Sequence, residues 1–554
     1  MKKLLIATAG VALMTASISS CSKKIDEAYA NPNADVRVPV ETLLPPLVSC
    51  MAANSAGHGP LNDIRFAGKF IQNFFWCNSG GEWERMGNRP GTDNAASLWR
   101  IHFYDIGQNC NNMIKWALEE EKWDYAGVGK AILAWSWLQL SDYHGEVIKP
   151  SEAFNTAALT FSYGTQEETY DHVRNLCHEA ISLLNTTGGS ASQANLAKGD
   201  AYFYDGDVNK WKKFVYGVLA RSFHHLTNKS IYNVDSVLYY CNLSINTNAD
   251  NAMVKFANTG ISGTANFFGP LRGNLASTLL VTESAIRQSA FIADMLSGLN
   301  SMFPNVQDPR AIYLLRKNAN GTFKGLSVNR GQTVMAANDR PENFWGVAQT
   351  TAINNTAPGT DGNCRYIFRN SAPFPVITAS EIQFIKAEAL WLPQGKNDKA
   401  GALAAYKEGI RLNLEMLKDV YSVNVPAGEE LTTQKIADFI NPATNPNVIP
   451  ATPNGLSLSH IMLQKYISMY IHGTFETWVD MRRYHYTDTF MGETVYRDFT
   501  PPSGTDLYTN NGGKLIYRTR PRFNSEYVWN LNELNRIGAS ALDYHTKECW
   551  FSQP

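Results

Sequence analysis

Amphipathic helical segments recur along the chain, and they constrain its fold more than any other feature. Apolar residues return roughly every three to four positions, the spacing that lines one face of an α-helix. The clearest segments are residues 129–140, 166–184, 211–226, 379–390, 399–416 and 458–470. Strand-like stretches are short, such as residues 515–517. The pattern predicts a mainly α-helical protein.

One neighbouring pair of these segments has the spacing of a tetratricopeptide helix pair. Residues 379–390 and 399–416 are separated by a short connection, so we expect them to pack together. The small–aromatic–small–aliphatic spacing of the second segment is carried by Ala402, Tyr406, Gly409 and Ile410. The intervals between helical segments are irregular, which excludes a regular solenoid. We therefore expect paired helices that are interrupted by long insertions.

Two stretches of the chain are predicted to be rich in loops. In residues 54–97 and 260–376, Gly, Asn and Pro interrupt every short apolar run. Long loops inside a compact protein usually carry function. We therefore expect the ligand site in these insertions.

The N-terminus has the features of a lipoprotein signal. Residues 1–20 combine Lys2 and Lys3 with a short apolar stretch, and Ile18-Ser19-Ser20-Cys21 has the form of a bacterial lipobox. We expect cleavage before Cys21 and acylation of its sulfur; the alternative is an ordinary signal peptide with an incidental cysteine. Residues 21–40 are polar and contain prolines, as suits a tether between lipid and domain.

Charge and cysteine usage exclude several classes of partner. Lys and Arg number 49 against 50 Asp and Glu and are scattered, so no basic field would gather nucleic-acid phosphates. Zinc-ligand spacings are absent from the cysteines, and we expect no structural metal and no cofactor. The Asp205-x-Asp207-x-Asn209 segment begins like an EF-hand loop, but Lys210 occupies the glycine position. An irregular cation site from scattered oxygens stays open.

A series of motifs, in order along the chain, resembles the SusD/RagB family of nutrient-binding outer-membrane lipoproteins. They are Asn31-Pro32-Asn33-Ala34, Val38-Pro39, Leu43-Leu44-Pro45, residues 163–184, residues 205–214, Asp308-Pro309-Arg310, residues 373–391, Gln464-Lys465-Tyr466, Glu476-x-Trp478-x-Asp480-x-Arg482-Arg483, and Arg520-Pro521-Arg522-Phe523 with Glu526. No single motif is specific to this family. Their order over most of the chain, behind a lipobox, is specific to it.

The resemblance implies a SusD-like domain over residues 41–554. In that fold, tetratricopeptide-like helix pairs support an irregular, loop-rich half that binds ligand. The resemblance also implies a lipid-anchored protein exposed at the outer membrane. Such a protein would capture an oligosaccharide or a peptide and pass it, without chemistry, to a SusC-type TonB-dependent transporter.

Aromatic residues within the loop-rich stretches are candidates for stacking against sugar rings. The C–H groups of a sugar pack on an aromatic face while its hydroxyls bond to neighbouring amide and guanidinium groups. The candidate ligand-binding residues are Trp76, Trp83, Arg85, Asn343, Phe344 and Trp345. Each ring is alternatively a core residue beneath a long loop. We expect Trp99, Trp135 and Trp211, which lie at helical positions, in the core.

The alternatives to a binding protein are an enzyme and a structural lipoprotein. The chain lacks HExxH, GxSxG, GxGxxG and the phosphate-binding GxxxxGK[ST] motif, so we expect no catalysis. A glycosidase stays open, because its carboxylate pair leaves no spacing signature. Aromatic loops favour a glycan over a peptide, although aromatic pockets also take apolar peptide side chains. We expect Asp480 with Arg482 and Arg483 to form a salt-bridged structural cluster rather than an anion site.

Overall fold

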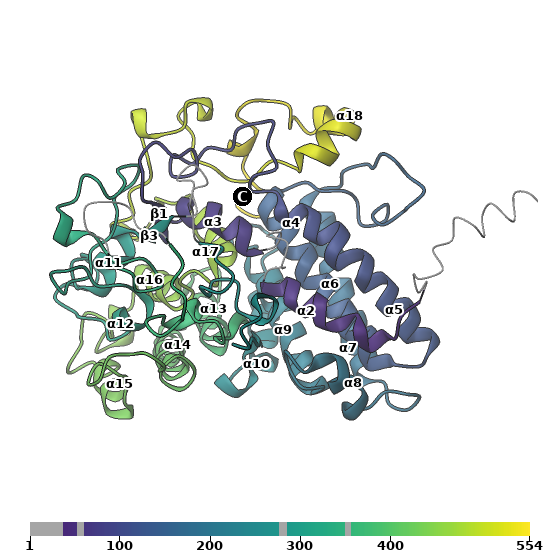
Figure 1. Ribbon diagram of the computed structural model, residues 1–554, viewed down its shortest axis with the longest axis horizontal. Coiled ribbons are helices and arrows are strands. Elements are labelled where there is room, and N and C mark those ends of the chain that lie inside the picture. Colours follow the sequence, from purple (N-terminus) through teal and green to yellow (C-terminus); the bar gives the residue numbers. More distant parts are fainter. Residues whose placement is uncertain (1–36, 53–59, 276–284, 349–355) are drawn as a thin grey trace, which may run out of the picture.

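The computed structural model describes residues 37–52, 60–275, 285–348 and 356–554. Within these ranges the chain is mainly helical, as predicted, and its few strands form three two-stranded sheets (Figure 1). None of the helices in these ranges is long and apolar enough to cross a membrane. The predicted signal segment, Cys21 and most of the tether lie outside the described residues.

The α-helices of the described ranges are α2 (Leu44–Ala52), α3 (Pro60–Phe70), α4 (Ser97–Arg100), α5 (Asn109–Glu119), α6 (Trp123–His144), α7 (Gln166–Asn185), α8 (Gln193–Asp200), α9 (Val208–His224), α10 (Val234–Leu243), α11 (Ala290–Leu296), α12 (Ala311–Leu314), α13 (Ala379–Trp391), α14 (Lys399–Val420), α15 (Thr433–Phe439), α16 (Leu458–Ser468), α17 (Thr474–Arg483) and α18 (Leu531–Arg536). Two π-helical segments are η2 (Ile101–Gln108), between α4 and α5, and η11 (Phe523–Tyr527), before α18. The strands are β1 (Phe74–Trp76), β2 (Ala252–Val254), β3 (Ile286–Gln288), β4 (Phe374–Ile377), β5 (Thr489–Phe490) and β6 (Glu493–Thr494).

Each helical segment predicted from periodicity coincides with a helix, and consecutive helices pack in pairs. The pairs α6–α7, α9–α10 and α13–α14 make extensive contacts. A capping box between Thr165 and Glu168 starts α7. In the predicted tetratricopeptide-like pair, a Cβ at Gly409 would lie 3.0 Å from the Phe384 ring, so glycine permits close packing of α13 on α14.

The family-like motifs converge on a buried ionic network inside this scaffold. Arg483 donates to Glu388 at 2.7 Å and to Asp480 at 2.6 Å, and Lys465 lies 2.7 Å from Asp480. Arg221 pairs with Glu381 in the same network. Buried charges need such partners because they have left water. The predicted structural role is confirmed for Asp480 and Arg483, whereas Arg482, expected in the same cluster, donates to the main-chain carbonyls of Asp142 and Tyr517.

The stretches predicted to be loop-rich contain regular elements as well. Residues 54–97 include α3 and β1, and residues 260–376 include β3, α11 and α12. Strand β1 pairs antiparallel with β3, and Phe75 lies opposite Arg287, so the two stretches meet in space. The strand predicted at residues 515–517 is wrong, because this segment is irregular. Its Tyr517 N–H donates to the carbonyl of His545, which lies in the 3-10 helix Tyr544–Thr546 rather than in a strand.

The seven cysteines of the described ranges, from Cys50 to Cys549, are all buried, and none of them is in a disulfide. The same ranges contain no cluster of three or more His, Cys, Asp or Glu side chains that could hold a metal ion. These thiols therefore act as small apolar groups in the core.

Candidate functional site

Four of the predicted ligand-binding residues are core side chains. Trp83, Asn343, Phe344 and Trp345 are each at most 3% exposed. The Trp83 ring lies 4.5 Å from that of Phe66, between centroids, and the Phe344 ring stacks at the same distance on Phe368. Trp345 Nε1 donates to a main-chain carbonyl, and the Asn343 side chain accepts two main-chain N–H groups of its own turn.

The expectation that these four side chains line a ligand surface is therefore corrected. A long loop that crosses a core buries its own large rings beneath it, because their apolar area stabilises the loop. Half-buried Trp76 lies in β1. Arg85 donates to the carbonyls of Thr505 and Leu507, and it lines a separate cavity of about 620 Å³. The structure thus does not bring the predicted residues together, and ligand binding by Trp76 and Arg85 stays a prediction.

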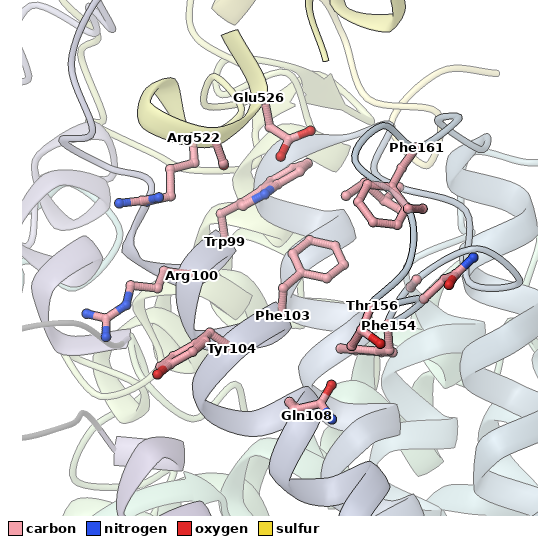
Figure 2. Close-up of a pocket in the computed structure, with 15 residues that line it drawn as sticks. Trp99, Arg100, Phe103, Tyr104, Gln108, Phe154, Thr156, Phe161, Arg522 and Glu526 are labelled. Atoms are coloured by element: carbon pink, nitrogen blue, oxygen red, sulfur yellow. The ribbon is translucent and has the colours of Figure 1, made fainter. Parts of the chain in front are cut away.

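Another cavity, of about 420 Å³, gathers aromatic side chains from three distant parts of the chain (Figure 2). We call it the aromatic cavity. Its walls come from α4 and η2, from the loop of residues 145–165 between α6 and α7, and from η11. Its rings are Trp99, Phe103, Tyr104, Phe154 and Phe161, and its polar side chains include Arg100, Gln108, Asn155, Arg522 and Glu526.

The π-helical segment places two of these rings at the cavity. Phe103 and Tyr104 lie in η2, and Trp99 precedes them on α4, so the three rings follow one continuous helical run (Figure 2). Segments of π-helix are rare and are frequent at functional sites. Tyr104 is 66% exposed, and the Arg100 guanidinium lies 5.4 Å from its ring centroid. The helix therefore offers an accessible ring beside a positive charge.

The opposite wall depends on an unusual backbone conformation. Phe154 has a φ of 65°, in the left-handed region that non-glycine residues rarely adopt. This conformation lays the ring on Gly107 of η2, where a Cβ would lie 2.2 Å from a ring carbon. The absence of a side chain at Gly107 thus lets the loop close onto the helix.

Helix α18 and Asn530, which directly precedes it, hold residues 161–163 of the same loop. Asn530 Nδ2 donates to the Phe161 carbonyl at 2.8 Å, and its Oδ1 accepts the Phe161 N–H at 3.2 Å. Glu533 accepts the Tyr163 N–H at 2.9 Å, and Arg536 donates to the Tyr163 carbonyl at 2.8 Å. These side chains provide hydrogen-bond partners for the main-chain N–H and C=O groups of the loop, as a neighbouring strand would. The Phe161 ring is thereby held in place.

A buried carboxyl lies at the inner end of the cavity. Glu526 accepts a hydrogen bond of 2.8 Å from the Tyr163 hydroxyl. Burial raises the pKa of Glu526, although hydrogen bonds from Tyr163 and Asn530 act against that rise. Arg522, at the rim, pairs with Asp93 at 3.1 Å. Among the described residues that line this cavity, Glu526 is the one carboxyl, whereas common glycoside hydrolysis uses two.

Sequence reasoning did not select most of this site. Trp99 was expected in the core and is 2% exposed, yet its edge contributes to the wall. Phe103, Tyr104, Phe154 and Phe161 were not singled out. Their one sequence signal is the crowding of aromatic residues in two segments that no local rule places side by side. Arg522 and Glu526 belong to the last of the family-like motifs.

A family model described as "Starch-binding associating with outer membrane" matches residues 32–498. The chain belongs to this SusD-like family. The match ends before η11 and α18, so part of the aromatic cavity comes from residues that the family model does not cover. No curated protein matches this SusD-like chain.

Solved structures show the same fold over almost the entire chain. A SusD/RagB family protein from Bacteroides thetaiotaomicron is 20% identical with a TM-score of 0.65, over 93% of this chain and 99% of the other. A SusD homolog from Bacteroides fragilis is 18% identical with a TM-score of 0.67, over 93% and 100%. A structure named "chitin-binding protein" is 19% identical with a TM-score of 0.65, over 93% and 100%. At these identities the likeness establishes the SusD-like fold.

Proposed function

We propose that this SusD-like protein captures an oligosaccharide in the aromatic cavity and delivers it, uncleaved, to a SusC-type TonB-dependent transporter. The observation that carries the proposal is the convergence of five aromatic rings with guanidinium and amide groups on one cavity of about 420 Å³. Cavities of this size and mixed lining are typical of small-ligand sites. The family description as starch-binding and the name of the chitin-binding relative support a glycan.

The chemistry of the lining favours a sugar over an apolar group. The rings provide flat faces for sugar C–H groups, while Arg100, Gln108 and Asn155 provide donors and acceptors for hydroxyls. An oligopeptide with an aromatic or aliphatic side chain is the alternative ligand, because the rings would also accept it. Among the described residues that line the aromatic cavity, Glu526 is the one carboxyl, which supports binding there without hydrolysis.

Lipid anchoring at Cys21 would keep the cavity near the transporter. Arg37, the first described residue, pairs with Glu119 at 2.7 Å and with Glu120 at 2.8 Å at the end of α5. The tether therefore joins the domain at the turn between α5 and α6. A short tether raises the effective concentration of captured ligand at the transporter mouth.

Calorimetric titration tests the capture. The protein starting at Ser22 is titrated with maltooligosaccharides, chitooligosaccharides and oligopeptides, and each mixture is analysed for products. We expect saturable binding of one oligosaccharide series with the ligand recovered intact. Cleaved ligand would establish an enzyme instead, binding of peptides alone would identify the alternative ligand, and no binding at all would refute capture.

A point variant ties the binding to the aromatic cavity. Tyr104→Ala removes an accessible ring, and we expect the affinity to fall about tenfold, the value of one stacking contact with its buried area. The matched control is Tyr239→Ala on α10, because Tyr239 is 60% exposed and lies outside the cavity. Unchanged affinity in Tyr104→Ala would place the ligand elsewhere.

A further inference from the structure

A second cavity, of about 360 Å³, adjoins the aromatic cavity. We call it the outer cavity. Phe161 lines both cavities, and both lie between the loop of residues 145–165 and the segment that leads into α18. In Figure 1 this loop and α18 lie at the same upper edge of the molecule. The outer cavity is also lined by Glu152, Thr160, Ser162, Trp529 and Asn532.

The outer cavity combines an exposed ring with a polar lining. Trp529 is 67% exposed, although a ring of this size is usually well covered in a folded protein. The same cavity is lined by two hydroxyl residues, two amide residues, two carboxylates and one leucine, namely Thr160, Ser162, Asn530, Asn532, Glu152, Glu533 and Leu531. A lipid or an apolar peptide would offer no hydrogen-bond partners to the hydroxyl and amide groups of this lining. A sugar suits both parts, because it has one apolar face and a periphery of hydroxyls.

The shared wall is rigid. Glu152 accepts the Ser162 N–H at 2.7 Å, and Asn530, which follows Trp529, bonds to both main-chain groups of Phe161. Tyr163 bonds to Glu533 and Arg536 of α18. A wall held from both sides loses little freedom when a ligand binds across it. The two cavities therefore have a constant spacing, as consecutive units of one polymer require.

We propose that the outer cavity is a second subsite for the same oligosaccharide, in which Trp529 stacks on the sugar units that extend beyond Phe161. The inference rests on the proposed function of the aromatic cavity and deepens it. Its consequence is selection by length: an oligosaccharide that spans both cavities binds more tightly than one that fills the aromatic cavity alone.

A length series tests the second subsite. Maltose through maltoheptaose and chitobiose through chitohexaose are titrated into the protein that starts at Ser22. We expect the affinity for the longest member of the binding series to exceed that for the shortest about tenfold, as one added stacking contact allows. In Trp529→Ala this ratio falls close to one, and in Trp529→Phe, which keeps a ring, most of the ratio returns.

Two comparisons make the outcome decisive. Tyr104→Ala is expected to weaken short and long members alike, and Tyr239→Ala, on α10, is expected to keep the wild-type ratio. A wild-type affinity that does not depend on length, or a Trp529→Ala ratio equal to that of the wild type, would overturn the second subsite and leave capture in the aromatic cavity intact. Binding of neither series by the wild type would overturn the proposed function, and the second subsite with it.

Discussion

At the scale of single residues, the shape of the aromatic cavity depends on two residues that do not line it. Gly107 provides the space that Phe154 fills, and Asn530 holds the main chain of Phe161. Glycine has no group that binds a ligand, and the amide of Asn530 is bonded to the main chain of Phe161. Both act by fixing where an aromatic ring lies, which determines whether separate rings form one surface.

Asn530→Ala tests this positioning at residue scale. The change leaves the N–H and C=O of Phe161 without their partner, and we expect the free energy of unfolding to fall by about 1–3 kcal/mol. We also expect weaker oligosaccharide binding, because the Phe161 ring is no longer held. Urea unfolding and calorimetry measure the two effects. In the control Asn532→Ala, an exposed amide is lost, and stability should stay within about 0.5 kcal/mol; equal stability of the two variants would contradict the role of Asn530.

At the scale of elements, the family-like motifs specify how helices are joined. His225, directly after α9, bonds to Glu476 of α17 at 2.9 Å and lies 3.4 Å from Asp142 of α6. Burial alone lowers the pKa of His225, but the two carboxylates outweigh it and raise that pKa to about 9. The protonated imidazole thus links three helices of the scaffold.

This linkage predicts a pH dependence of stability. The pKa of His225 rises from its model-peptide value of 6.5 to about 9 on folding. Protonation of His225 therefore adds on the order of 3 kcal/mol to the free energy of unfolding below pH 6.5. This stabilisation is lost as the pH rises through 9. Urea unfolding between these pH values should show the decline, and His225→Gln should flatten it. The control is exposed His178→Gln, and a wild-type curve that rises with pH in this window would contradict the assignment.

The element scale also explains where sequence-based prediction succeeded. Helical periodicity is local, so residues 166–184 could be placed within one residue of α7. The burial of Trp83 and Trp345 is not local, because it depends on Phe66 and Phe268 from other parts of the chain. A tryptophan in a loop looks the same in sequence whether it covers the core or faces solvent.

At the scale of the whole molecule, the proposed role requires the domain to stay at the membrane. Arg37, the first described residue, pairs with Glu119 and Glu120 at the end of α5. The mature N-terminus is proposed to be Cys21, whose acyl chains would hold the protein at the outer membrane.

Cys21→Ser tests the anchor. We expect the variant to leave the membrane fraction and to lose metabolic labelling with palmitate, because serine offers no sulfur for acylation. The control is Ser19→Ala, a small-for-small exchange in the lipobox that should keep both signals. Retention of Cys21→Ser in the membrane fraction, with labelling intact, would refute lipidation at this residue.

The helical scaffold, the SusD-like family and the candidate lipidation signal could all be predicted from the sequence, because periodicity and motifs can be recognised without knowing how distant segments pack. The position of the aromatic cavity, by contrast, depends on the tertiary structure. Trp99, Phe161 and Glu526 are separated by tens to hundreds of residues, and packing of α4, the loop of residues 145–165 and η11 brings them to one cavity. The same packing buries Phe344 and Trp345. Whether an aromatic ring lies in the core or at the surface depends on which other segments of the chain cover it.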